Sequence, residues 1–145
     1  MIHPDQVSWI NVSGVHDTQC IARLGNFFRL HPLLLEDLMH TGQRPKIEEY
    51  DQDLFIVLKM LTYEPKNSSI QEEQVSLVLG KSWVLSFQER EGDVFEFVRD
   101  RILRTKGKIR RMGSDYLAYA LVDAVVDHYF GVLEQIVDKI EDLQD

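Results

Sequence analysis

Cysteine is almost absent from this chain of 145 residues, in which Cys20 is the only one. A single thiol excludes an intrachain disulfide, a thiolate zinc cluster and a Cys-x-x-Cys redox pair, and it fits a reducing compartment such as the cytosol. Glycine and proline are also scarce, at 8 and 4 residues, so collagenous and low-complexity classes fit poorly. The apolar share of 44% can supply one core. We therefore expect a single folded domain over residues 1–145.

Positive charge is in deficit: the chain has 16 lysines and arginines but 24 aspartates and glutamates, which gives a formal net charge of -8. Such a chain repels a phosphate backbone, so we expect no nucleic-acid partner, and cations are its natural small partners. The positive charge that exists is concentrated. Residues 99–111 hold seven positive side chains against one aspartate, a local charge of +6 that leaves -14 for the remainder. We interpret this basic segment as a solvated face or a docking surface for acidic elements.

Long hydrophobic runs are missing as well. The longest, residues 54–58 and 117–126, fall short of the roughly 20 residues that a membrane-spanning helix needs, and Asp123 interrupts the second. The N-terminus lacks the pattern of a secretory signal. Residues 80–82 read Gly-Lys-Ser, but Val75 occupies the place where a phosphate-binding loop needs glycine. With no nucleophile or metalloprotease motif either, we expect no enzyme and no small-molecule substrate.

The periodicity of apolar residues predicts an α/β fold. The expected elements are a strand at 8–12, a helix after Asp17, a second helix at 32–39, strands at 46–50, 54–63, 70–79 and 83–88, a helix from Asp93 to near Gly107, and a long helix from Ser114. Polar turns join the last four strands, which is typical of an antiparallel meander. We expect Trp9, Trp83 and the phenylalanines to pack in the core. Gln71, Glu73 and Lys81 should lie at frayed or outer positions of the sheet.

The last helix runs from Ser114 to the end of the chain in mid-pattern and without a capping residue. We therefore expect residues 1–113 to form the sheet and its covering helices. Residues 114–145 would be the start of a helix that continues in a longer protein.

Carboxylates provide the most suggestive pattern. Asp123 and Asp127 are four residues apart on the long helix, and Glu36 and Asp37 are adjacent on a short exposed helix. Magnesium is held by one or two such carboxylates together with retained waters. On pattern alone, a solvated acidic face remains the simpler interpretation.

Two histidines flank the short helix and leave another alternative open. Glu36 and His40 share one helix face, so with His31 and Asp37 they could form a zinc or cobalt ligand set. We favour a simpler role for His31, which precedes Pro32 and is placed to hydrogen-bond locally at the start of the helix.

The order of several segments resembles the cytoplasmic portion of CorA-type magnesium transporters, and the similarity covers essentially the whole chain. The matching pieces are Trp9-Ile10-Asn11-Val12, His31-Pro32-Leu33, Leu35-Glu36-Asp37, Gln43-Arg44-Pro45-Lys46, residues 55–60, 73–76, 87–89 and 92–95 with Arg99, and Asp115-Tyr116-Leu117 followed by Asp123, Asp127, Tyr129 and Phe130.

The resemblance implies an α/β/α sandwich around a mixed, largely antiparallel sheet. It also implies a subunit of a homopentameric cell-membrane channel for Mg2+, with Co2+ and Ni2+ accepted, whose cytoplasmic part senses magnesium. Asp37 matches the inter-subunit regulatory carboxylate of the family, while Glu36 and Asp123 match a second, adjacent site and Asp127 lies nearby. The family completes these sites with an aspartate beyond Asp145, and its Gly-Met-Asn pore signature is absent here. Contact with the membrane would be made only by the missing C-terminal part.

Our hypothesis is that Glu36, Asp37 and Asp123 converge and that Mg2+ bridges them to an acidic neighbouring subunit, which favours the closed pore. The zinc-transporting branch of the same family is an alternative. A second alternative is a hydrolase that binds two metal ions through these three residues and Asp127. A third is an interaction module whose basic segment docks acidic partners or lipid headgroups.

Overall fold

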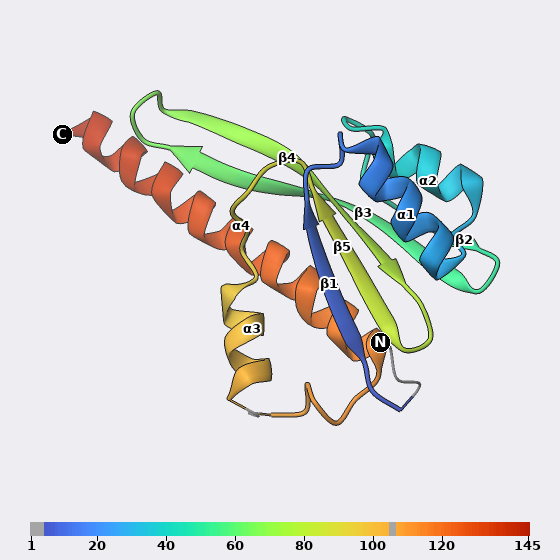
Figure 1. Cartoon of the computed structure of the whole chain (residues 1–145). Coiled ribbons are helices and arrows are strands. Elements are labelled where there is room, and N and C mark those ends of the chain that lie inside the picture. Colours follow the sequence, from blue (N-terminus) through green and yellow to red (C-terminus); the bar gives the residue numbers. More distant parts are fainter. Residues whose placement is uncertain (1–4, 105–106) are drawn as a thin grey trace.

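The structure is a computed structural model, and it describes residues 5–104 and 107–145. These residues form five strands and four helices around one sheet (Figure 1). In chain order the elements are β1 (Ser8–Ser13), α1 (Thr18–Phe28), α2 (Pro32–Met39), β2 (Lys46–Tyr50), β3 (Asp53–Glu64), β4 (Ser69–Leu79), β5 (Trp83–Gln88), α3 (Glu96–Leu103) and α4 (Ser114–Gln144).

The sheet has the strand order β1-β5-β4-β3-β2. Strands β2 to β5 form the predicted antiparallel meander, while β1 pairs with β5 in parallel, with Ser8 opposite Trp83. Parallel strands need a long connection, and here two helices and three strands lie between β1 and β5 in the chain. The expectation of a mixed, largely antiparallel sheet is therefore confirmed.

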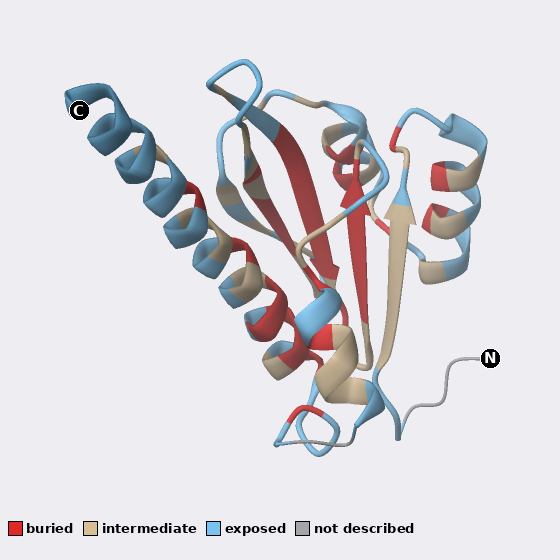
Figure 2. Cartoon of the chain, turned by 90° about the vertical axis from the view of Figure 1, so that its left-hand side faces the viewer, coloured by how far each residue is buried: buried red, intermediate tan, exposed pale blue. Residues whose placement is uncertain are grey.

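Each face of the sheet has its own apolar core. Leu34 and Leu38 of α2 pack with Ile21 of α1 against one face, together with Phe55 and Phe87 from the strands. On the other face, the apolar side chains of α3 and α4 pack against a second set of strand residues. Figure 1 shows the two helical layers on opposite sides of the sheet, and Figure 2 shows the buried strands between them. The predicted α/β/α sandwich is confirmed.

Local hydrogen bonds explain where the first two helices begin. The carboxylate of Asp17 accepts from the backbone N–H of Cys20, 3.1 Å away, as expected for an N-cap. At α2, Nδ1 of His31 accepts from the backbone N–H of Leu33 at 3.1 Å, and Pro32 takes the first helical position, where a missing donor has no cost. The interpretation of His31 as a local helix-start residue is confirmed.

Helix α4 has buried residues as far as Val132, and its Tyr129 hydroxyl donates to the backbone carbonyl of Lys59 on β3. Leu117 and Leu121 are among the buried residues, whereas the last turns project past the sheet and are exposed (Figure 2). By length and mean hydropathy α4 could also cross a membrane. The short apolar runs of the sequence did not predict this. A helix that packs in a protein core can have the same length and mean hydropathy, so these two features of α4 are only a weak indication of a membrane span.

Three phenylalanines do not pack as we expected. Phe27, Phe97 and Phe130 are 67%, 72% and 61% exposed, respectively. Each lies on a helix at a spacing that fits an apolar stripe, but the stripe that faces the sheet is a different one. Helical spacing alone does not say which of two adjacent stripes is covered.

Two further expectations are corrected. Glu73 is only 5% exposed, because burial of β4 begins at this residue and its Oε1 accepts from the backbone N–H of Arg90 at 2.6 Å. The helix expected from Asp93 begins at Glu96, since the Asp93 carboxylate accepts from the backbone N–H of Phe95 and fixes a turn before the helix. Helix α3 ends at Leu103, and the rest of the expected stretch includes residues 105 and 106, outside the described residues.

Candidate metal-binding site

Asp37 lies on α2 with its side chain directed toward β2. Its Oδ2 accepts a hydrogen bond from Lys46 Nζ at 3.1 Å and lies 2.7 Å from the Tyr50 hydroxyl. At the end of α2, the side-chain amide of Gln43 donates to the backbone carbonyl of Asp37 at 2.7 Å and to that of His40 at 2.9 Å. The helix end and the strand edge together fix the position of this carboxylate.

Glu48 joins the same cluster. Its Oε1 lies 3.0 Å from Lys46 Nζ, and its Oε2 lies 2.7 Å from the hydroxyl of Tyr50. That hydroxyl has one proton, so it donates to only one of the two carboxylates, Asp37 or Glu48, at a time. Lys46 forms ion pairs with both carboxylates, so the cluster of Asp37, Lys46, Glu48 and Tyr50 has a net charge of -1.

Hydrogen bonding holds both carboxylates in their charged form. The Tyr50 hydroxyl and then the Lys46 ammonium lower the pKa of Asp37, with partial burial opposing them. The same two donors lower the pKa of Glu48. Because the Glu48 and Asp37 carboxylates beside it favour the protonated hydroxyl, the pKa of Tyr50 is raised above its usual value. At neutral pH the cluster therefore offers ionised oxygens to a cation.

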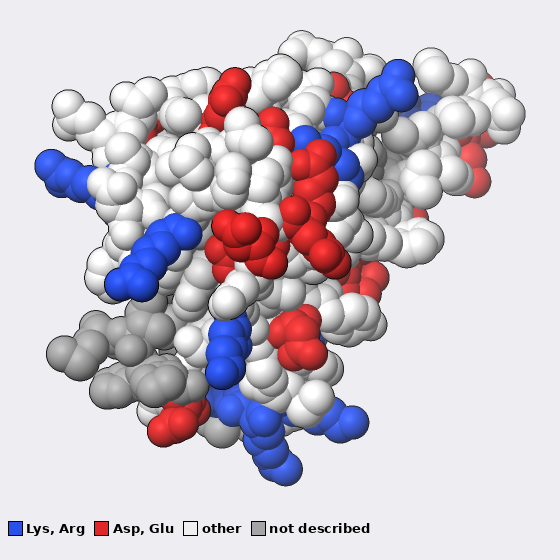
Figure 3. Space-filling view, turned by 90° about the vertical axis from the view of Figure 1, so that its right-hand side faces the viewer, with Lys and Arg blue, Asp and Glu red and all other residues white. Residues whose placement is uncertain are grey.

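Glu36 is exposed beside Asp37 and has no hydrogen-bond partner among the described residues. Figure 3 shows acidic side chains gathered in the middle of the face that carries α2 and β2. Asp37 is thus brought together with the carboxylate of Glu48 through Lys46 and Tyr50, and Glu36 is the exposed neighbour of Asp37 on α2. Sequence reasoning missed Lys46, Glu48 and Tyr50.

A sequence signal for those three residues exists. They alternate on β2, whose exposure also alternates along the strand, so that all three project from the same face. Lys46, Glu48 and Tyr50 follow one another at a spacing of two residues. A positive charge, a negative charge and a hydroxyl in this arrangement indicate a polar face whose side chains bind one another, rather than a core face.

Asp123 and Asp127 lie on α4, and both are exposed. Helix α4 covers one face of the sheet and α2 covers the other, so the sheet separates these two carboxylates from Glu36 and Asp37 (Figure 1). The expectation that Glu36, Asp37 and Asp123 converge within one chain is therefore wrong. Periodicity predicted both helices, but it does not encode which face each of them covers.

No metal-ligand cluster is assembled in the described part of the chain, where no group of three or more His, Cys, Asp or Glu side chains could hold an ion. The four-carboxylate centre of the hydrolase alternative is not formed, because its residues lie on opposite layers. The proposed zinc set of Glu36, Asp37, His31 and His40 is not formed either, and Nδ1 of His31 serves the helix start.

A second polar cluster holds α3 against the sheet. Arg99 binds Asp93 through two hydrogen bonds of 2.8 and 2.5 Å, and its guanidinium lies 5.2 Å from the centre of the Trp9 ring. Burial alone would raise the pKa of Asp93, but the hydrogen bonds from Arg99 and from the Phe95 N–H outweigh it, and the pKa is lowered. With Asn11 Nδ2 donating to the same carboxylate at 3.3 Å, this cluster is satisfied internally.

These features define a class of protein domain: a three-layer α/β/α sandwich prolonged by one long helix, with carboxylates exposed on both outer layers. Residues 4–145 match the family model described as CorA-like Mg2+ transporter protein. The chain therefore belongs to the CorA-like family.

Individual relatives agree with this assignment. The chain is 50% identical over 138 residues to the cobalt/magnesium transport protein CorA of Thermotoga maritima, covering 95% of this chain and 39% of that protein. The complete CorA magnesium transporter from Methanocaldococcus jannaschii matches with a TM-score of 0.72 at 17% identity, over 94% of this chain and 42% of that one. The cytoplasmic domain of ZntB from Vibrio parahaemolyticus matches with 0.66 at 12%, over 92% and 55%. The two structural matches concern the fold alone, and the chain spans about two fifths of the Thermotoga protein.

Proposed function

We propose that this chain is the cytoplasmic, Mg2+-sensing domain of a divalent cation transporter of the cell membrane. In this proposal, Mg2+ binds at Glu36 and Asp37 of one subunit and Asp123, with Asp127 nearby, of the next. The ion holds the subunits of a homopentamer together and favours the closed pore. The family assignment and the half-identical cobalt/magnesium transport protein support this function. Co2+ and Ni2+ are hard enough to use the same oxygens.

One observation carries the inter-subunit part of the proposal: the two carboxylate groups lie on opposite outer layers, and both Glu36 and Asp123 are exposed. One chain cannot bring them to a single ion. Two copies placed side by side in the same orientation can, because the α2 layer of one copy then faces the α4 layer of the next. Such head-to-tail contacts close into rings.

Electrostatics makes such an interface depend on a cation. The cluster around Asp37 keeps a net charge of -1 despite Lys46, so further carboxylates from a neighbouring subunit would add like charge. A divalent ion between the two layers reverses the sign of that interaction. The contribution per site is small, about 1 kcal/mol at a few times the Kd, but it sums over the interfaces of a ring.

Lys46 also predicts a weak site. Its ammonium group already binds Oδ2 of Asp37, so an incoming ion must use the remaining oxygen or displace the lysine. Competition with an internal cation lowers the affinity. Weak affinity suits a sensor of a cation that cells hold at high concentration.

The decisive experiment combines Asp37→Ala with Asp123→Ala in the full-length transporter. We expect the double variant to lose the protection from protease that Mg2+ gives the parent. A matched control, Glu72→Ala with Asp138→Ala, removes the same charge from exposed positions elsewhere and should stay protected. Unchanged protection of the double variant would refute the sensor proposal.

The zinc-transporting branch remains the alternative, supported by the likeness of fold to the cytoplasmic domain of ZntB. The two proposals differ in the preferred ion. Because Zn2+ binds most ligand sets at least as tightly as Mg2+, affinity alone does not separate them. Uptake by the full-length transporter with Mg2+ and Zn2+ supplied together does, since each proposal names a different transported ion.

A further inference from the structure

The basic segment, residues 99–111, is only partly neutralised within the chain. Three of its cations have internal partners: Arg99 binds Asp93, Arg104 binds Asp100, and Arg101 hydrogen-bonds to the Tyr116 hydroxyl. Lys106 lies outside the described residues. Among the residues that the structure describes, the remaining cations, Lys108, Arg110 and Arg111, have no carboxylate within the 4.0 Å limit of an ion pair. Positive charge is thus left over at one end of α4.

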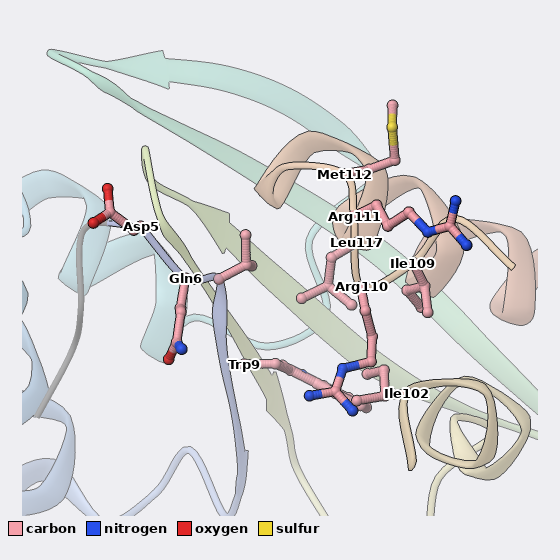
Figure 4. Close-up of a pocket in the computed structure, with 10 residues that line it drawn as sticks. Asp5, Gln6, Trp9, Ile102, Ile109, Arg110, Arg111, Met112 and Leu117 are labelled. Atoms are coloured by element: carbon pink, nitrogen blue, oxygen red, sulfur yellow. The ribbon is translucent and has the colours of Figure 1, made fainter. Parts of the chain in front are cut away.

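Two of these cations line a hollow of about 490 Å³ at the start of α4. In Figure 4, Arg110 extends toward Trp9 and Ile102, whereas the side chain of the adjacent Arg111 extends in a different direction, past Ile109. Ile109 and Leu117, both buried, form an apolar wall, and Asp5 lies across the hollow from the arginines. We call this hollow the Arg110 pocket. Its volume is in the range that small-molecule ligands occupy.

The physical setting favours a ligand that is anionic at one end and apolar at the other. Guanidinium groups bind phosphate oxygens through paired N–H donors, and they do so more strongly beside an apolar wall, where the local dielectric is low.

We propose that the Arg110 pocket binds a phosphate ester that carries an apolar or aromatic body. Arg110 and Arg111 hold the phosphate, and the body lies against Trp9, Ile102 and Leu117. An anionic phospholipid and a free nucleotide share this chemistry. The site is separate from the carboxylates of α2 and does not depend on the proposed sensing of Mg2+.

Trp9 provides the readout. In a Trp83→Phe background it is the only tryptophan left, so a ligand that enters the pocket changes the fluorescence of that one residue. The probes are ATP, inorganic phosphate, and vesicles of phosphatidylcholine with or without phosphatidylglycerol, all in EDTA so that metal sites are empty. Calorimetric titration of the chain with both tryptophans makes the same comparison without the background substitution.

We expect saturable binding of ATP, of phosphatidylglycerol vesicles or of both, and weaker binding of inorganic phosphate, which has no body to bury. Arg110→Ala with Arg111→Ala should weaken binding at least about tenfold, because two charge-assisted contacts are lost. Arg23→Ala with Arg44→Ala removes the same charge from other exposed positions and should leave the affinity within about twofold.

The outcomes separate the sources of the phosphate. Binding of phosphatidylglycerol vesicles alone identifies a lipid headgroup, and binding of ATP alone identifies a soluble ligand. The proposal is overturned if neither binds, if vesicles of pure phosphatidylcholine bind equally well, or if the two double variants lose affinity to the same extent. All four substituted arginines are exposed, so the folded state should persist, and circular dichroism checks this.

Discussion

Asp93→Asn should destabilise the fold more than any other single change of charge in the described residues. The side chain of Asp93 is 9% exposed and accepts two hydrogen bonds from Arg99, one from the Phe95 N–H and one from Asn11 Nδ2. Asparagine is nearly the same size, so the substitution removes the charge and leaves no cavity. An amide oxygen still accepts from Phe95, whereas the bidentate bond to the guanidinium is lost.

The magnitude follows from the exposure of the two partners. Removing one partner of a fully buried ion pair costs about 3–5 kcal/mol, because the other charge is left without compensation. The side chain of Arg99 is 32% exposed and can turn to water, which lowers the cost. We expect a loss of about 2 kcal/mol, which corresponds to a fall in Tm of about 6 °C for a chain of this size.

The pH dependence gives an independent check. The pKa of Asp93 is lowered in the folded state. The ionised carboxylate therefore contributes its full stabilisation of the fold above the ordinary aspartate pKa of about 3.9, and this stabilisation is lost as the pH falls through the pKa that Asp93 has in the folded state. The parent and Asp93→Asn should therefore differ most at neutral pH and converge in acid. Urea denaturation at a series of pH values, followed by circular dichroism, measures the difference.

Asp100→Asn is the matched control. Asp100 also pairs with an arginine of α3, Arg104, at 2.8 Å, but both side chains are roughly half exposed. Exposed ion pairs contribute about 0–1 kcal/mol, so this variant should keep nearly all of the parent stability. Equal effects of the two substitutions, or a difference that does not shrink in acid, would mean that the Asp93 clamp does not stabilise the fold as argued.

Two further predictions concern β2 and the β4–β5 turn. In Tyr50→Phe, the pKa values of Asp37 and Glu48 should both rise toward their ordinary values, because the hydroxyl that lowers them most is gone. Lys46 should still hold both pKa values somewhat below normal, and NMR titration of the carboxyl carbons measures them. In Gly80→Ala, the new methyl group would overlap the ring of Trp83, so urea denaturation should show a loss of about 1–3 kcal/mol, and an unchanged midpoint would contradict the tight packing.

Elements with a strong local signal could be predicted closely from the sequence. The strands at 46–50 and 83–88 have the expected bounds, and the long helix begins at Ser114 as expected. In each case a polar turn or a change of period lies next to the element. The start of α3 was misjudged, because Asp93 has the side chain of a helix cap but is bonded to Arg99, six residues on, which no local pattern encodes.

The candidate site was predicted only in part, for a related reason. Glu36 and Asp37 do lie on a short, partly exposed helix, as their spacing indicated. Their relation to Asp123 depends on which face of the sheet each helix covers, and that is decided by the whole topology rather than by spacing. The partners of Asp37 on β2 were missed because cross-element contacts between polar residues leave little periodic signal.

In the proposed function, the layered fold makes metal binding conditional on assembly. Because the sheet separates Asp37 from Asp123, an ion held by both has to lie between two copies, and its affinity then depends on how often the copies meet. Within one copy, Lys46 already binds Oδ2 of Asp37, so we expect the free subunit to have little attraction for Mg2+. Lys46→Met should therefore raise the affinity for Mg2+ and shift protease protection of the full-length protein to lower Mg2+, whereas weaker protection would show that Lys46 belongs to the interface rather than competing with the ion.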